Sequence, residues 1–439
     1  MPTVRDSQLF EKLESALPGY LEFLRTETRS GALVIPRVLV ARIEFTSGGF
    51  SVDEEWATDY SGLVAKALSA LRGNPQFDER LNILLATPSL SRFLRVSSGA
   101  AEPTTMNLEI SLLSPFLTRY LKTLPKEVAE AMEFDQATFA NVYNELEEYL
   151  LNDNDKYRIA TLLVNFEMGR SKFEIGPFVI RLLDNREVVE LNQILPDYRA
   201  MPIPFPFEIP RFALELTVSV PRGSPPGTPL TLDKIWWIVC CLELCRRGVV
   251  FYNDVWYFPD PWSPYPGVSR QISKRAAAPG PKFVLGEQDI PILEQLWKSL
   301  EKHVEKPPPF WLVAFHRFYE STLRGRLEDR LIDSWIACEA LFGAGVEMGE
   351  MRYQLSLRLA HFLEGDPTKR RATFDFAKEA YKWRGKVVHG SPKLDPQKLR
   401  SMADGMEDLV RRSLARCVLD QVVSQESLIE SIEKSILGF

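Results

Sequence analysis

Six consecutive segments with helical periodicity follow a run of three prolines, and they constrain the fold of this chain more than any other feature. The run is Pro307–Pro309, and apolar residues after it recur at the three- and four-residue steps of amphipathic helices. The segments span about 311–322, 324–343, 350–364, 368–389, 395–421 and a stretch after Ser424. Because helices of this length with short connections pack in alternating directions, residues 307–439 are predicted to form an antiparallel helical bundle.

The fourth of these helices has clear start and stop signals. Asp366, Pro367 and Thr368 supply the short polar cap and the proline that commonly open a helix. Gly390 and Pro392 supply the stop. A single stripe of this helix is predicted to face the core, on a 3-4-3-4 spacing, and it consists of Phe374, Ala377, Tyr381, Arg384 and Val388.

Arg384 is the one member of that stripe that does not suit a core. Its guanidinium stays protonated, so on a buried stripe it needs a carboxylate or a phosphate. His389 follows five positions later, where the helix meets its glycine stop. On an intact helix the two side chains would lie about 140° apart around the axis. They converge only if the helix end unwinds or a second chain contributes.

The rest of the chain divides by pattern into two further regions. Residues 1–160 are predicted to be mostly helical, with a short strand pair in 32–45. Residues 161–306 show strand alternation in 173–183 and 212–220, a segment rich in β-branched and aromatic residues in 249–258, a helix in 232–247 and long proline-rich loops. The predicted fold class is therefore mainly α, with an α+β middle region and a C-terminal antiparallel bundle.

Composition limits the classes of partner and compartment. The net charge of −6 excludes a chain that is basic throughout, so contact with a polyanion requires a local patch. Residues 369–393 offer one, because eight basic and two acidic residues give a net charge of +6 there. The five cysteines form no Cys-x-x-Cys pair, which favours buried thiols in a reducing cytoplasm over a zinc site or a disulfide framework. No apolar run is long enough to span a membrane.

Three segments of the bundle resemble the HEPN domains, and among them the Apea-like branch typical of anti-phage proteins. They are Leu327–Phe342, Tyr353–Leu363 with Arg358 and Ala360 near its middle, and Tyr381–Gly390. The bundle that holds them is under a third of the chain. The resemblance implies a homodimer that joins two Arg-His pairs in one cleft and cleaves RNA without a metal or another cofactor.

Carried onto this sequence, the resemblance places Arg384 and His389 at the family's two catalytic positions. Histidine suits proton transfer near neutral pH, and arginine suits a phosphate whose negative charge increases during the reaction. Many active members carry a polar residue directly after the arginine, whereas this chain has Gly385. Because glycine is unfavourable inside a helix, its presence indicates a close approach of another backbone or of substrate. Gly385, Lys382 and Lys386 are therefore candidates for substrate binding.

Other interpretations of these residues remain open. Arg384 can be a structural ion-pair partner of Asp333 or Glu339 on the long upstream helix, and these two acids are candidate supporting residues. His389 can be a histidine that simply favours the negative end of the helix dipole. The predicted function is an RNA endonuclease in bacterial anti-phage defence, with the N-terminal regions sensing or restraining it through a phage-derived trigger or a neighbouring inhibitor. The alternative is a non-catalytic module that dimerises and binds RNA or a nucleotide.

Overall fold

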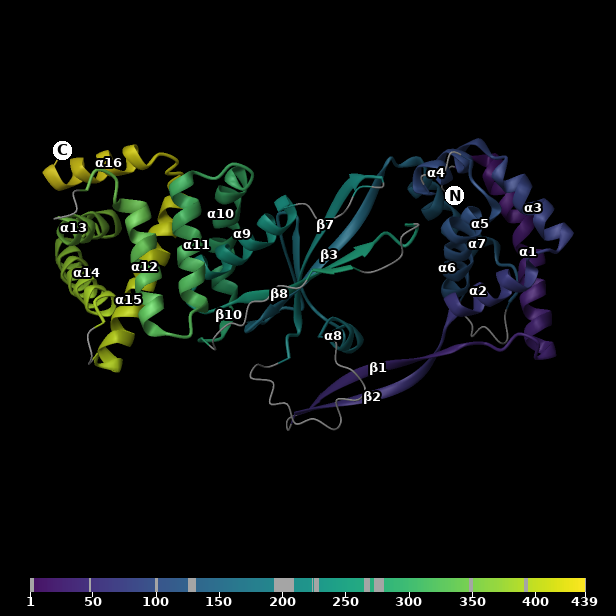
Figure 1. The fold of residues 1–439 in the computed structure, drawn as a ribbon, viewed down its shortest axis with the longest axis horizontal. Coiled ribbons are helices and arrows are strands. Elements are labelled where there is room, and N and C mark those ends of the chain that lie inside the picture. Colours follow the sequence, from purple (N-terminus) through teal and green to yellow (C-terminus); the bar gives the residue numbers. More distant parts are fainter. Residues whose placement is uncertain are drawn as a thin grey trace.

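The computed structural model describes residues 4–46, 49–98, 102–124, 132–192, 209–222, 224, 229–263, 269–271, 280–346, 350–390 and 394–438. The molecule is elongated (Figure 1), with a helical lobe at the N-terminal end, a sheet in the middle and a helical region at the C-terminal end. This order agrees with the predicted mainly helical class with a sheet-containing middle region. None of the helices in these ranges is both long and apolar enough to cross a membrane.

The N-terminal lobe is built from helices whose apolar faces share one core. Leu13, Leu17 and Leu21 of the first helix are buried in it at helical spacing. Pro18 lies inside that helix without dividing it. The helices are α1 (Ser7–Ser30), α2 (Tyr60–Leu71), α3 (Pro75–Leu85), α4 (Pro88–Ser98), α5 (Thr105–Leu108), the π-helical turn η1 (Glu109–Leu113), α6 (Ser114–Thr123) and α7 (Gln136–Leu151).

A long hairpin leaves this lobe and reaches the middle of the molecule. Strand β1 (Arg37–Thr46) pairs in antiparallel register with β2 (Gly49–Thr58). The sequence predicted a strand pair within 32–45, but only β1 lies there and its partner follows it. Ile43 is fully buried against a small apolar cluster that includes Leu162 and Val188 of the middle region. The hairpin therefore links the two regions through a core of its own.

The middle region contains a six-stranded antiparallel sheet. Its central strand, β3 (Asn154–Val164), was not identified from the sequence, because the stretch before residue 160 was assigned to the helical region. The sheet order is β5 (Lys172–Ile175), β6 (Phe178–Leu182), β7 (Phe212–Pro221), β3, β8 (Phe251–Pro259) and β9 (Ser269–Gln271). Two short strands, β4 (Phe166–Met168) and β10 (Phe283–Leu285), form a separate parallel pair.

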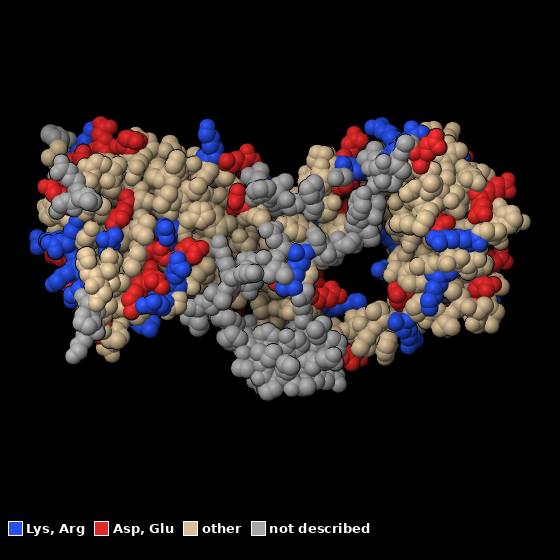
Figure 2. All heavy atoms as spheres, in the orientation of Figure 1, with Lys and Arg blue, Asp and Glu red and all other residues tan. Residues whose placement is uncertain are grey.

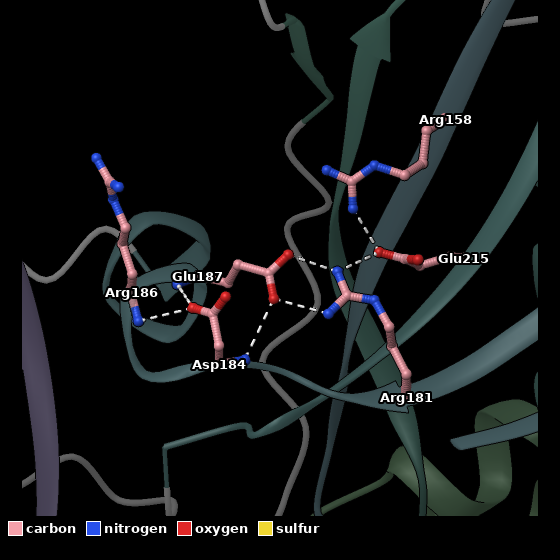
Figure 3. A network of polar contacts seen from close by, with 6 residues as sticks. All are labelled: Arg158, Arg181, Asp184, Arg186, Glu187 and Glu215. Carbon is pink, nitrogen blue, oxygen red and sulfur yellow. Dashed lines mark hydrogen bonds and ion pairs between the residues drawn. The ribbon is translucent and has the colours of Figure 1, made fainter. Parts of the chain in front are cut away.

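The two faces of this sheet pack against different helices. Ile159 and Leu214 point into the large core that also contains α9 (Pro229–Cys245) and α10 (Ile290–Leu300). The opposite face carries polar groups that bind α8 (Asn185–Asn192), as Figure 3 shows. In that network the carboxylate of Glu215 accepts from Arg158 at 2.6 Å and from Arg181 at 2.8 Å. Arg181 also binds Glu187 of α8, and this bond lowers the pKa of the Glu187 carboxyl.

The C-terminal region is helical as predicted, and its helix boundaries agree with the sequence to within a few residues. Its core is continuous with the core beneath the sheet, because α9 and α10 pack against helix α15 (Pro396–Leu419). Trp311, Trp335 and Phe315 are fully buried there. The helices are α11 (Pro309–Leu323), α12 (Leu327–Phe342), α13 (Met351–Leu363), α14 (Pro367–Val388), α15 (Pro396–Leu419) and α16 (Gln425–Leu437).

Candidate functional site at the end of helix α14

Helix α14 begins and ends through the residues that the sequence indicated. The Asp366 carboxylate accepts hydrogen bonds from the backbone N–H groups of Thr368 at 3.0 Å and Lys369 at 2.9 Å. Pro367 occupies the first turn, where its missing N–H costs nothing. Gly390 has φ +65°, the left-handed conformation that commonly follows a helix. These signals fix where His389 lies along the axis.

The buried face of α14 differs from the predicted one. Ala377, Ala380 and Trp383 are the buried residues of this helix, whereas Val388 is 52% exposed. The helix is turned so that the large Trp383 ring enters the core, and its indole N–H donates to Glu379 at 3.0 Å. Arg384 consequently lies at the edge of the buried face instead of inside it. The prediction of an arginine on a core stripe was wrong in this respect.

Arg384 faces helix α12, where it approaches Glu339. The distance from Arg384 Nη2 to Glu339 Oε1 is 3.5 Å, and the side chains are 27% and 23% exposed. Arg384 Nε and Glu339 Oε1 are both buried without a hydrogen-bond partner among the described residues. Burial raises the pKa of Glu339, and the charge of Arg384 opposes that rise. The pair is therefore loose, and the partly exposed guanidinium has one buried donor without a partner among the described residues.

The other acid proposed as a support, Asp333, does not contact Arg384. Its carboxylate is nearly buried and accepts from Arg317 at 3.0 Å and from Arg324 at 2.9 Å. Both of these arginines come from α11 or the turn that follows it. Asp333 therefore holds α11 against α12. Of the two ion-pair partners suggested for Arg384, the structure brings only Glu339 within reach.

His389 stands at the exposed end of α14. Its backbone N–H donates to the carbonyl of Gly385 at 3.0 Å, which is a regular helical bond, and its side chain is exposed. The helix therefore does not unwind before His389. Helix geometry then keeps Arg384 and His389 about 140° apart around the axis. One chain presents the arginine towards α12 and the histidine on another side of α14.

The three candidate substrate-binding residues lie on the accessible surface of the same turns. A Cβ atom added at Gly385 would meet nothing within 4 Å, so the space over this backbone is open within the described chain. Lys382 is exposed. The Lys386 ammonium lies 4.3 Å from the centre of the Trp383 ring, in a cation–π contact. The missing side chain of Gly385 therefore leaves a small open space, which we call the notch, near the cationic side chains of Lys382 and Lys386.

A longer surface feature was missed in the sequence. Six exposed or half-buried residues recur on one side of α14 at steps of three and four, which we call the α14 stripe: Arg371, Phe374, Lys378, Lys382, Gly385 and His389. Tyr353 of α13 is 54% exposed and meets the Phe374 ring edge-on at 5.5 Å. The Lys378 ammonium lies 4.9 Å from the same ring. The signal was available as a second helical period beside the predicted core stripe.

Lys and Arg side chains gather at the edge of the bundle where α13 and α14 lie (Figure 2, left margin). The α14 stripe includes the basic residues Arg371, Lys378 and Lys382, and its other members are an aromatic residue, a glycine and the candidate histidine. Within the described ranges, no three His, Cys, Asp or Glu residues are arranged to hold a metal ion. The α14 stripe itself is cationic and aromatic, although Arg371 is paired with Asp375 at 2.7 Å, and Glu339 is the acid that Arg384 approaches.

The chain matches no protein-family model, no curated protein and no solved structure.

Proposed function

We propose that this protein is a metal-independent RNA endonuclease of the HEPN type, with Arg384 and His389 as its catalytic residues. The observation that carries the proposal is their arrangement on one intact helix end. A guanidinium whose buried Nε has no hydrogen-bond partner among the described residues lies about 1.4 turns before an exposed imidazole, on a helix with a cationic surface. Both groups have the chemistry that transfer of a phosphoryl group requires.

The proposed reaction is an internal transfer within RNA. His389 takes the proton from a ribose 2′-OH, and that oxygen attacks the adjacent phosphorus. The bond from phosphorus to the 5′-oxygen of the next nucleotide breaks, and the leaving oxygen receives a proton from the imidazolium that His389 has become. The products are a 2′,3′-cyclic phosphate and a 5′-hydroxyl. Arg384 donates hydrogen bonds to the phosphoryl oxygens, whose negative charge grows in the transition state.

The 140° separation within one chain means that a shared cleft requires a second copy. Tyr381 and Val388 lie beside Arg384 on the same side of α14, and Val388 is exposed. Gly385 lies about 100° further round the helix, between Arg384 and His389. Glycine permits a close approach of two helix backbones. A two-fold contact along this side would bring the histidine of each copy towards the arginine of the other. We therefore include a homodimer through α14 in the proposal.

The α14 stripe suits single-stranded RNA. The distance along the axis from Phe374 to His389 is about 22 Å at 1.5 Å per residue, which is enough for several nucleotides. Lys378 and Lys382 can neutralise phosphates, while Phe374 and Tyr353 offer ring faces and edges to a base. RNA would then bind along α14 and place one phosphate near the helix end.

The remaining regions have a proposed regulatory role. The N-terminal lobe and the sheet lie away from α14 (Figure 1), and the large core joins the sheet to the bundle. A change in the sheet region can therefore reach the bundle through packed side chains. We propose that these regions sense infection in the bacterial cytoplasm or restrain the nuclease, through a phage-derived trigger or a neighbouring inhibitor.

A cleavage assay tests the catalytic assignment. Purified protein is incubated with mixed RNA in excess EDTA, and wild type is compared with Arg384→Ala and His389→Ala. We expect cleavage by wild type and a loss of about 100-fold or more in both variants, the usual effect of removing a general acid–base group. His361→Ala is the matched control, because this histidine lies on α13 beside Ser435 and is not part of the α14 stripe.

The Arg384–Glu339 contact also favours a second candidate function. If the ion pair is structural, the same bundle binds RNA or a nucleotide without cutting it. The assay separates the two, because RNA binding that persists without cleavage under all conditions supports the non-catalytic module. Cleavage that needs a metal, or that is equal in wild type and His389→Ala, contradicts the proposed nuclease.

A further inference from the structure

We propose that the N-terminal lobe contains a binding site for a small amphipathic carboxylate, with its apolar part in a pocket and its charge at Arg80. The pocket lies between α1, α2, α3 and α6 and has a volume of about 180 Å³. Its walls include Leu17, Tyr20, Leu68, Leu81, Phe116 and Leu117. This site is separate from α14, and the inference does not depend on the proposed nuclease.

The walls and the size of the pocket define the apolar part of the ligand. The wall residues named above are all buried, so they belong to the lobe core and not to its outer surface. An apolar cavity of about 150 Å³ holds a molecule the size of benzene. The present pocket therefore has room for a single ring or a short alkyl chain. This volume limits the part of the ligand that lies inside the pocket.

The opening of the pocket is polar and contains one cation. Asn74, Gln76 and Arg80 line it and are exposed. Asn74 already accepts two backbone hydrogen bonds as the cap of α3, at 3.0 and 3.3 Å. Arg80 has no hydrogen bond or ion pair with any residue that the structure describes. A guanidinium beside apolar walls favours a ligand that combines an apolar body with an anionic end.

The guanidinium of Arg80 lies close to the backbone of α1 at Gly19. Arg80 Nη1 lies 2.5 Å from the position that a Cβ atom of Gly19 would occupy. A side chain at position 19 would therefore require the flexible end of Arg80 to move. Gly19 follows Pro18, and these are the two residue types least favourable inside a helix. Such a local conflict with helix propensity is expected where the chain forms a functional site.

A carboxylate is the anion that best fits these contacts. Its two oxygens can accept from one guanidinium in a bidentate arrangement, while the adjacent carbons enter the pocket. A doubly charged group would face a single cation here. A cationic head group would face the guanidinium and be repelled.

Binding of matched eight-carbon probes to the full chain tests the site. Octanoate, 1-octanol and octylammonium share one apolar chain and differ in head-group charge, and calorimetry measures the affinity of each. We expect octanoate to bind at least tenfold more tightly than 1-octanol, and octylammonium to bind most weakly. Arg80→Gln should remove the preference for octanoate, whereas Arg92→Gln, an exposed arginine on the same lobe, should keep it.

A second variant tests the location of the apolar part. Ala16 lines the pocket and is half-buried, so Ala16→Leu fills part of the space without a new charge. It should weaken binding of both octanoate and 1-octanol at least tenfold, with an unchanged circular dichroism spectrum. The proposal is overturned if octanoate does not bind, if it binds no better than octylammonium, or if Arg80→Gln binds it as wild type does.

Discussion

Arg384 of α14 lies 3.5 Å from Glu339 of α12, yet Arg384 Nε and Glu339 Oε1 are buried without hydrogen-bond partners among the described residues. Burial of the carboxylate raises its pKa, and the arginine is the charge that opposes this rise. This contact has two interpretations. Arg384 and Glu339 form a structural ion pair, or the guanidinium of Arg384 binds a phosphate of the substrate.

The Arg384–Glu339 pair should stabilise the fold in a pH-dependent way. Because the folded pKa of Glu339 is raised above its ordinary value, ionisation of this carboxyl lowers stability as the pH rises through the folded pKa. Arg384→Ala removes the opposing charge, so its cost should be small at pH 4 and about 1 kcal/mol larger at pH 8. Urea unfolding at both pH values measures this difference. An equal cost at both would show that the contact has no electrostatic role.

Replacing Gly385 by alanine should raise the stability of the protein and lower its activity. A Cβ atom there meets no other atom, and alanine is more favourable than glycine inside a helix by about 1 kcal/mol. We therefore expect Gly385→Ala to raise the free energy of unfolding by about 0.5–1 kcal/mol and to lower the rate of RNA cleavage, because the notch is filled. Thermal unfolding and the cleavage assay check the two parts. A stabilised variant with unchanged activity would mean that neither substrate nor a second chain approaches this backbone.

The α14 stripe should set the salt dependence of RNA binding. Each phosphate contact on a single strand contributes about 0.7 to the slope of log affinity against log salt concentration. Lys378→Ala and Lys382→Ala should each weaken binding and reduce the slope by about that amount, as fluorescence anisotropy with a short single-stranded RNA would show. Lys302→Ala, an exposed lysine outside α14, serves as the control. Equal slopes in all proteins would place the RNA elsewhere.

Glu243 should lower the stability of the protein at neutral pH. This residue of α9 is buried, accepts from the N–H of Val250 and the hydroxyl of Thr322, and lies near Glu407. Burial raises its pKa well above the ordinary value. Glu243 therefore does not lower the free energy of unfolding below about pH 4.5, where the carboxyl is protonated in both states. Above that pH the free energy of unfolding falls by about 1.4 kcal/mol per pH unit until the folded pKa is passed.

The variant Glu243→Gln keeps the acceptor oxygen but cannot ionise. We expect it to match wild type near pH 4 and to be increasingly more stable between pH 5 and 7, by denaturant unfolding. Glu301→Gln, at an exposed glutamate, is the control and should follow wild type throughout. If wild type instead becomes more stable relative to Glu243→Gln as the pH rises from 5 to 7, the result contradicts a raised pKa of Glu243.

Much of the helical architecture was predictable because its signals are local. Asp366 with Pro367 and Gly390 define α14 through capping, and these interactions involve only neighbouring residues. The central strand β3 was missed because its identity depends on pairing with β7 and β8, which are distant in sequence. Pairing of that kind leaves only a weak local pattern.

The candidate site was predictable in position but not in orientation. The sequence placed Arg384 on the core stripe because Phe374, Tyr381 and Val388 share its period. The structure shows a different face buried, since Trp383 and the small Ala377 and Ala380 fit the core better. Two helical periods overlap on α14, and only the packing against the other helices decides which one is buried. The contact of Arg384 with Glu339, in preference to Asp333, follows from the same rotation.

The chemistry of the cleaved end tests the proposed function most directly. An RNA oligonucleotide that wild type cleaves in excess EDTA is compared with the same oligonucleotide carrying one 2′-deoxy nucleotide at the cleaved position. If Arg384 and His389 catalyse attack by the 2′-OH, the first should yield a 2′,3′-cyclic phosphate and the second should stay intact. His389→Ala should then yield no product from either. Equal cleavage of both oligonucleotides, or cleavage that survives in His389→Ala, would contradict the account.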